Sequence, residues 1–334
     1  MLKIIRSDIL KLLAWFLGSL IIGAALAPFL YHGCKAIVQF RVLGSFGDAG
    51  LWLQSKLDNA HFGRYFNRSM LLGALVCLYP LIRSLKLKKA HLGLEKNSNR
   101  FSELGIGFIL AAGILFIFGI VYFQMGIFER TNSFSFRIIL KFIISAITVS
   151  LIEEYLFRGF LFGAVKRTAS TFSTLLFISF FFAIIHFLKP PLNCARLADS
   201  DIHYFGTGFW TVGQIFAQFE NPIFIAKGFA TLFVVGLVLG WARIKTSSLW
   251  LSIGLHAGWV FSVKIYDYHS NIPTRYDKNF LLPYIGSDLK EGLIPLLGVL
   301  LTGILAMLWI AIRQKNYFVT IKNHDQRGLS LEDR

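Results

Sequence analysis

Apolar residues in this chain are gathered into long runs separated by short polar segments. A helical run of roughly 17–25 apolar residues is long enough to cross the hydrocarbon core of a bilayer, which is about 30 Å thick. Such runs predict membrane-spanning helices at Leu12–Tyr31, Met70–Leu85, Ile106–Phe123, Ile138–Phe162, Thr171–Leu188, Ile223–Trp241, Ser248–Ile265 and Leu293–Ile312. The pattern therefore predicts an all-α polytopic membrane protein, in which about eight transmembrane helices form a bundle. We expect residues 1–334 to form one membrane domain that ends in a short cytoplasmic tail, residues 313–334.

The composition agrees with this prediction. Of the 334 residues, 55% are hydrophobic and only 16% are charged, whereas soluble domains carry about 25% charged residues. The formal net charge is +16, but the Lys and Arg residues are scattered between the apolar runs. Nucleic-acid-binding proteins gather their basic residues on one face or one domain. The charge therefore indicates topology anchors, with the lipid bilayer as a partner and no role for nucleic acid.

The distribution of basic residues predicts the orientation in the membrane. The segment RSLKLKKAHLGLEKNSNR, between the second and third predicted spans, carries six Lys and Arg residues. Short loops rich in Lys and Arg remain in the cytoplasm, and an even number of spans places both termini on the same side. We therefore expect both termini in the cytoplasm, with the protein in the cytoplasmic membrane of a bacterium. On the outer side, GLWLQSKLDNAHFGRYF is expected to lie along the membrane interface as an amphipathic helix.

Four ionisable residues fall deep inside predicted spans. Glu153 and Glu154 lie in SLIEEYLFRG, His186 in FFAIIHFL and His256 in LSIGLHAGWVF. A charge at the bilayer centre costs at least ~2.5–3.5 kcal/mol on insertion scales. The helical rise places Glu154, His186 and His256 about 15–22 Å from the cytoplasmic ends of their spans, which is one common level. Glu154 and Arg158 are four residues apart and share a helix face, so we predict an ion pair between them, while Glu153 points about 100° away.

A purely structural explanation is the first alternative for these residues. A lone intramembrane histidine often forms a hydrogen bond between helices, and one glutamate can serve as the counter-ion of Arg158. A second glutamate beside the first adds desolvation cost without any gain in packing. The set as a whole therefore favours a functional site.

Three motifs around these residues resemble a known family. EEYLFR, Glu153–Arg158, matches EExxxR; FAIIH, Phe182–His186, matches FxxxH; and HAGWV, His256–Val260, matches the first part of HxxxN. In this order and spacing they resemble the CPBP family of intramembrane endopeptidases, the CaaX protease and bacteriocin-processing (or Abi) family. The resemblance covers roughly residues 138–265, which we expect to be the catalytic core.

The resemblance implies an eight-helix bundle with a conical intramembrane cavity that opens to the cytoplasm and to lipid. It also implies an endopeptidase that cleaves a membrane-associated peptide or protein. In the family pattern Glu153 activates the attacking water, with Glu154 and His186 assisting. His256 helps to bind the developing oxyanion.

One position departs from the family pattern. The family usually has Asn where this chain has Val260, and a residue four positions after His256 shares its helix face. An Asn there can donate a hydrogen bond to the oxyanion, which is worth about 2.7–4 kcal/mol in a serine protease, whereas Val has no donor. Ser252, four residues before His256 on the same face, is our candidate for a substitute donor. Arg158 and Phe182 are the other residues expected to support the site.

The required chemistry also follows from the residue types. Peptide hydrolysis needs a base for the water, an acid for the leaving amine and hydrogen-bond donors for the oxyanion. Two adjacent carboxyl groups and two histidines can supply all three. The favoured mechanism therefore requires no cofactor.

Other functions remain open at this stage. Zinc could be held by His186, His256 and either Glu153 or Glu154, with a water in the fourth position, although the sequence has no HExxH motif. Intramembrane carboxylates and histidines also form proton or cation relays in transporters, but we find no internal repeats of the kind transporters show. A third alternative is a non-catalytic protein that acts by binding, as in bacteriocin immunity.

Overall fold

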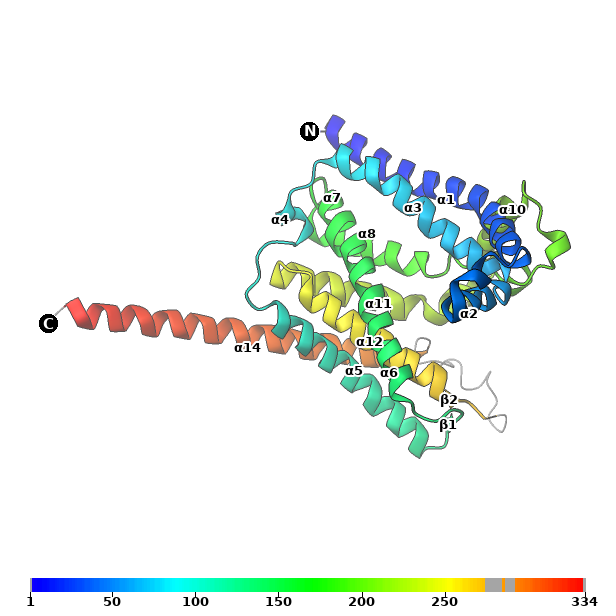
Figure 1. Cartoon of the computed structure of the whole chain (residues 1–334). Helices are drawn as coiled ribbons and strands as arrows, with labels where there is room; N and C mark the ends of the chain where they lie inside the picture. The colour runs from blue at the N-terminus through cyan, green and yellow to red at the C-terminus, as the bar shows by residue number, and fades with distance from the viewer. Residues whose placement is uncertain (1, 274–283, 286–291, 333–334) are drawn as a thin grey trace. The chain divides into compact units, whose positions relative to one another are not determined.

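The computed structural model describes residues 2–273, 284–285 and 292–332, and most of the described chain is helical. It divides into two compact units. The first consists of residues 1–87 and 184–225, and the second of residues 88–183 and 226–334. Each unit is described separately below, with the element labels of Figure 1.

The first unit is built on two long helices that pack side by side, α1 and α3 (Figure 1). Its α-helices are α1 (Leu2–Gln39), α2 (Gly47–Asp58), α3 (Phe62–Leu85), α9 (Leu192–Ala195) and α10 (Thr207–Ala217), with short 3₁₀ helices at Val42–Phe46, Asp199–Asp201 and Gln218–Glu220. Glycines allow the close approach of α1 and α3, because a Cβ atom added to Gly73 would lie 2.6 Å from the carbonyl oxygen of Ser19. An aromatic core that includes Tyr31, Phe62 and Phe66 fills the unit.

The second unit carries the motifs. Its helices are α4 (Lys89–Leu92), α5 (Arg100–Gln124), α6 (Phe136–Glu154), a π-helical segment (Tyr155–Leu161), α7 (Phe162–Lys166), α8 (Thr171–Ile185), α11 (Pro222–Thr246), α12 (Trp250–His269) and α14 (Leu293–Glu332). The ends of α8 and α11 extend into the first unit. Strands β1 (Glu129–Arg130) and β2 (Ser270–Asn271) form a small antiparallel sheet, with Glu129 opposite Asn271.

Helix α12 is the central element of this unit. Every residue from Leu251 to Trp259 is buried, because α12 packs along α5 and against α6. Apolar side chains of α5, α11 and α14 complete one core with α12, and Leu239 and Leu255 are fully buried within it. A helix that is buried all round holds its side chains in fixed positions, including the polar ones.

Glycines set the distance between α5 and α12. A Cβ atom added to Gly254 would lie 2.2 Å from the carbonyl oxygen of Leu104, and one added to Gly258 would lie 2.6 Å from that of Phe108. Small residues at this spacing let two membrane helices approach closely enough for backbone contact. Because Gly254 and Gly258 flank His256, the same contact fixes the position of that histidine.

The structure confirms the all-α fold, and most of each of the eight predicted spans is helical. The helix in the fifth span ends at Ile185, before Leu188, and the helix in the seventh begins at Trp250, after Ser248. Five helices of the described chain are long and apolar enough to cross a membrane: Leu10–Gln39, Phe62–Leu85, Arg100–Gln124, Gly228–Thr246 and Leu293–Lys315. Helix α8 is shorter, while α6 and α12 carry charged or polar side chains within their length. The count of eight spans therefore stays a prediction. Helix α14 continues through the segment predicted as a polar tail, as far as Glu332.

The segment predicted to lie along the interface is divided between two helices. Its first part forms α2, with exposed Leu51 and Trp52, and its last part begins α3 at Phe62. The second predicted span therefore starts eight residues earlier than Met70, because the helix continues past the end of the apolar run.

The glycine contact leads to a first prediction. Gly254→Ala should lower the melting temperature in detergent, because the new methyl group meets the α5 backbone and overpacking costs about 1–3 kcal/mol. The matched control is Gly113→Ala on α5, where an added Cβ meets nothing within 4 Å. That control should be neutral or slightly stabilising, since Ala favours helix over Gly. Equal melting temperatures for the two variants would contradict the proposed role of the contact.

Candidate active site

The two adjacent glutamates close helix α6 and face different surroundings. Glu154 is fully buried, whereas the side chain of Glu153 is 28% exposed. After Glu154 the backbone continues as the π-helical segment Tyr155–Leu161 before α7 begins. π-helical turns are rare in proteins, and those that occur are often found at functional sites. The helix thus presents one carboxylate to the interior and the other toward a more open side.

Glu154 forms the ion pair that the spacing predicts. Arg158 Nη1 donates to Glu154 Oε1 at 2.8 Å, and both side chains are fully buried. Arg158 Nη2 also donates to the carbonyl oxygen of Gly236 on α11 at 3.4 Å. The guanidinium carbon lies 4.3 Å from the ring centroid of Phe182 on α8, which is a cation–π arrangement. Arg158 therefore links α6, α8 and α11 within the second unit.

The same carboxylate oxygen also binds His256. Its Nδ1 lies 2.9 Å from Glu154 Oε1, and only 7% of the histidine side chain is exposed. When Glu154 is ionised, Nδ1 must carry the proton of this hydrogen bond, and the orientation of the ring is then fixed. The rings of Phe182 and His256 are nearly perpendicular, with 6.0 Å between their centroids.

This orientation turns the other ring nitrogen toward the second glutamate. His256 Nε2 lies 3.8 Å from Glu153 Oε2. Two atoms at that separation are too far apart for a direct hydrogen bond. Both can nevertheless lie within hydrogen-bond reach, about 2.6–3.2 Å, of one shared oxygen atom. The arrangement can therefore hold a water molecule or a carbonyl oxygen between a base and a donor.

The structure thus brings together five of the residues singled out in the sequence: Glu153, Glu154, Arg158, Phe182 and His256. His186 follows the last residue of α8 and belongs to the first unit, while the other five lie in the second. The part that His186 takes in the site therefore stays a prediction.

Ser252 is held by a hydrogen bond to helix α11. Its hydroxyl group is fully buried and donates its single proton to the carbonyl oxygen of Leu239 on α11 at 2.9 Å. Sequence spacing placed Ser252 on the face of His256, but α11 packs against that end of α12 and captures the hydroxyl. The role predicted for Ser252, that of a substitute oxyanion donor, stays a prediction.

Val260 is part of an apolar wall. It is half-buried and packs against the core cluster of Ala146, Phe261 and Ile265, between α6 and α12. The position where the family pattern has Asn therefore contributes methyl groups and no donor. Among the five clustered residues, His256 Nε2 remains as the donor directed toward Glu153.

A catalytic zinc ion has defined requirements for its protein ligands. A catalytic zinc ion takes three protein ligands, and within this cluster Glu153 Oε2 and His256 Nε2 face each other. Glu154 Oε1 already accepts hydrogen bonds from Arg158 and from His256 Nδ1. Across the described part of the chain, no three His, Cys, Asp or Glu side chains are arranged to hold a metal ion.

Two positioning features were not predicted from the sequence. The carbonyl oxygen of Gly236 accepts a hydrogen bond from Arg158, and a Cβ atom added to Gly236 would lie 2.8 Å from Ser179 on α8. A backbone carbonyl that accepts a side-chain hydrogen bond leaves no pattern of side chains in the sequence. Gly254 and Gly258, by contrast, are four residues apart, which is the spacing of a close helix contact. That contact could have been predicted from the sequence.

Residues 135–262 match the model of a protein family described as type II CAAX prenyl endopeptidase, Rce1-like. The matched segment is less than half of the chain and contains all three motifs. The match confirms the family predicted from the motifs, the CPBP or CaaX protease family. No curated protein and no solved structure matches the chain.

The buried ion pair leads to a second prediction. Arg158→Met should destabilise the protein by about 3–5 kcal/mol, because it leaves Glu154 as a buried charge without its main counter-ion. The double variant Glu154→Gln/Arg158→Met should recover much of this loss, since a buried pair can often be replaced by uncharged groups at little cost. Thermal unfolding in detergent measures both. A double variant that is less stable than Arg158→Met would contradict this account of the pair.

Proposed function

We propose that the protein is an intramembrane endopeptidase in which Glu153 activates water for attack on a peptide bond. The observation that carries the proposal is the 3.8 Å separation between Glu153 Oε2 and His256 Nε2. Glu154 Oε1 is hydrogen-bonded to Arg158 and to the other ring nitrogen of His256, Nδ1. The family match supports a protease of the CaaX type.

The residues divide the steps of hydrolysis among themselves. Glu153 takes a proton from the water molecule while the water oxygen bonds to the carbonyl carbon of the peptide. The negative charge that develops on the carbonyl oxygen is met by the N–H of His256 Nε2, when the ring is protonated on both nitrogens. Buried Glu154 stabilises that protonated ring and holds its orientation. As the carbon–nitrogen bond breaks, Glu153 returns its proton to the leaving amine.

The substrate is a membrane-anchored peptide or protein on this proposal. If the helices that carry the candidate site cross the membrane, as we propose, a substrate already held in the bilayer reaches the site directly. The description of the matched family makes a prenylated CaaX peptide the first candidate. We further propose eight spans with an intramembrane cavity, both termini in the cytoplasm and a location in a bacterial cytoplasmic membrane. Most of each of the eight predicted segments is helical, which supports the predicted spans.

No cofactor is required by these steps. Zinc is the alternative mechanism, with His186, His256 and Glu153 or Glu154 as ligands. Metal analysis of the purified protein, together with cleavage measured before and after treatment with a chelator, separates the two mechanisms. Activity that is lost with the metal and restored by added zinc would establish the zinc mechanism.

Val260 favours a second candidate function. Without a donor at this position the oxyanion has less support, which fits a protein that binds a membrane partner without cutting it, as a bacteriocin-immunity protein does. A cleavage assay distinguishes the two, with the purified protein in liposomes and a farnesylated CaaX peptide as the first probe. Membrane proteomes with and without the protein would extend the search to other uncut precursors.

The third prediction concerns Glu153. Glu153→Gln keeps the volume of the side chain but removes its basicity, so cleavage should fall by about 10²–10⁴-fold. The melting temperature should stay equal or rise, because a partly desolvated charge is removed. The matched variant Glu154→Gln should lower both activity and melting temperature, since it weakens the partner of Arg158. Full activity in Glu153→Gln would exclude Glu153 as the base.

The fourth prediction concerns Val260. Val260→Asn should raise kcat, because it adds a donor one helical turn from His256, and an oxyanion-hole donor is worth about 10²–10³ in kcat in a serine protease. Val260→Leu is the control, since it changes the volume without adding a donor. A kcat that is unchanged in Val260→Asn and in Val260→Leu would indicate that the oxyanion lies elsewhere.

A further inference from the structure

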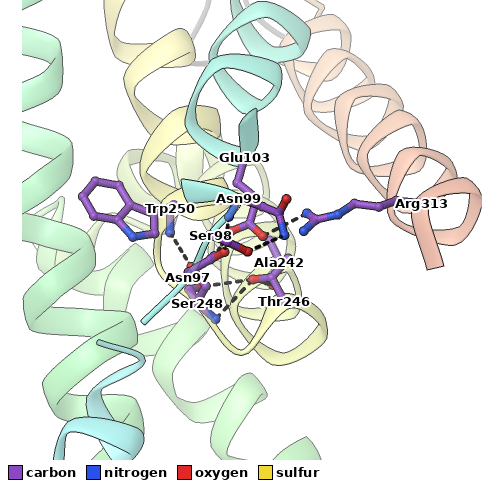
Figure 2. A network of polar contacts seen from close by, with 9 residues as sticks. All are labelled: Asn97, Ser98, Asn99, Glu103, Ala242, Thr246, Ser248, Trp250 and Arg313. Carbon is purple, nitrogen blue, oxygen red and sulfur yellow. Dashed lines mark hydrogen bonds and ion pairs between the residues drawn. The ribbon is translucent and has the colours of Figure 1, made fainter. Parts of the chain in front are cut away.

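A second buried carboxylate lies far along the sequence from the candidate site. Glu103 is on the first turn of α5 and is 2% exposed. Arg313 on α14 donates from Nη1 to Glu103 Oε1 at 3.0 Å, and Asn97 Nδ2 donates to Oε2 at 2.8 Å. Figure 2 shows the Arg313 side chain extending from its helix to the carboxylate of Glu103. Both oxygens of the carboxylate are thus hydrogen-bonded.

Asn97 connects the Glu103 carboxylate with the start of α12. Its Nδ2 also donates to Ser248 Oγ at 2.9 Å, and Ser248 Oγ accepts from the backbone N–H of Trp250 at 3.2 Å (Figure 2). Trp250 is the first residue of α12. The side-chain oxygen of Asn97, Oδ1, accepts a hydrogen bond from the backbone N–H of Asn99 at 2.8 Å. The amide therefore has one partner for each of its two N–H bonds and one for its oxygen.

The turn between α11 and α12 depends on such side-chain support. Ser247 has a φ of 52°, a left-handed conformation that is uncommon for a residue other than glycine. The Thr246 hydroxyl lies 2.9 Å from the carbonyl oxygen of Ala242 and 3.0 Å from that of Ser248 (Figure 2). Side chains, and not a glycine, thus hold the turn that sets where α12 begins.

The start of α12 determines the position of His256. The histidine follows Trp250 by six residues, which is about 9 Å along a rigid helix. Glu103 also lies one turn before Gly107, and a Cβ atom added to Gly107 would lie 2.8 Å from the Leu251 carbonyl oxygen. The polar cluster is therefore continuous with the glycine contact between α5 and α12. A shift of α12 along α5 would change the 2.9 Å hydrogen bond from His256 to Glu154.

We propose that Glu103 is a positioning residue for His256, and that its ion pair with Arg313 makes this positioning depend on helix α14. Asn97 transmits the restraint from the carboxylate to Ser248. Arg313 neutralises Glu103, which would otherwise be a buried charge with an amide as its partner. The proposal rests on the proposed function only where activity is measured.

Hydrogen exchange tests the restraint without any substrate. In the purified full-length protein in detergent, Arg313→Gln should raise amide exchange several-fold in residues 250–256, and Arg313→Lys should restore most of the protection. Asn97→Leu should give the same local increase with the Glu103–Arg313 pair intact. Lys315→Gln is the matched control, because it removes a neighbouring exposed charge of α14. Unchanged exchange at residues 250–256 in both Arg313→Gln and Asn97→Leu would overturn the proposal.

Activity provides the second measurement, with a farnesylated CaaX peptide as the probe. Arg313→Gln and Asn97→Leu should lower kcat by about tenfold or more with little change in KM, since a misplacement of about 1 Å can cost 10²-fold. Exchange that rises equally across α5, α11 and α14 would instead indicate a general loss of stability, and would also overturn the proposal. If the unmodified protein does not cleave the probe, that result counts against the proposed function, and the exchange data still decide the positioning role.

Discussion

A single buried carboxylate oxygen, Glu154 Oε1, holds the candidate site together. It accepts hydrogen bonds from Arg158 at 2.8 Å and from His256 at 2.9 Å. An ionised carboxylate among apolar helices is costly unless it is paired and hydrogen-bonded. His256 comes from α12 and Arg158 from the π-helical segment that follows α6, so meeting this requirement also fixes how α12 packs against this part of the chain. The ion pair thus compensates the buried charge of Glu154. The same carboxylate then orients the ring of His256.

The two adjacent glutamates have different tasks because of where α6 directs them. Successive helical residues point about 100° apart, so the burial of Glu154 leaves Glu153 on another side, where it is partly exposed. Glu154 Oε1 already accepts hydrogen bonds from Arg158 and from His256, so protonating this oxygen would disrupt both contacts. Glu153, which faces His256 Nε2 at 3.8 Å, is the better candidate to receive a proton. On the proposed mechanism, the same pair of residues provides both a rigid support and a reactive group.

Helix α12 carries His256 and is restrained from several directions. Gly254 and Gly258 bring it against the α5 backbone, and Ser252 ties it to α11 through Leu239. At its start, the contact from Asn97 to Ser248 connects it with Glu103 and Arg313. Each restraint uses a hydrogen bond or a backbone contact, which are short-range and directional. This is why side chains far from the glutamates can influence the geometry at His256.

The sequence by itself determined the helical fold, the membrane class and the family, because apolar runs and the spacing of motifs are local properties of the chain. It also predicted the pair of Glu154 and Arg158, since residues four apart share a helix face. Only the tertiary structure decided which glutamate is buried, where the Ser252 hydroxyl donates its proton, and that Glu103 meets Arg313. These outcomes depend on contacts between helices distant in sequence. Helical periodicity gives the face on which a side chain lies but not the neighbour that covers that face.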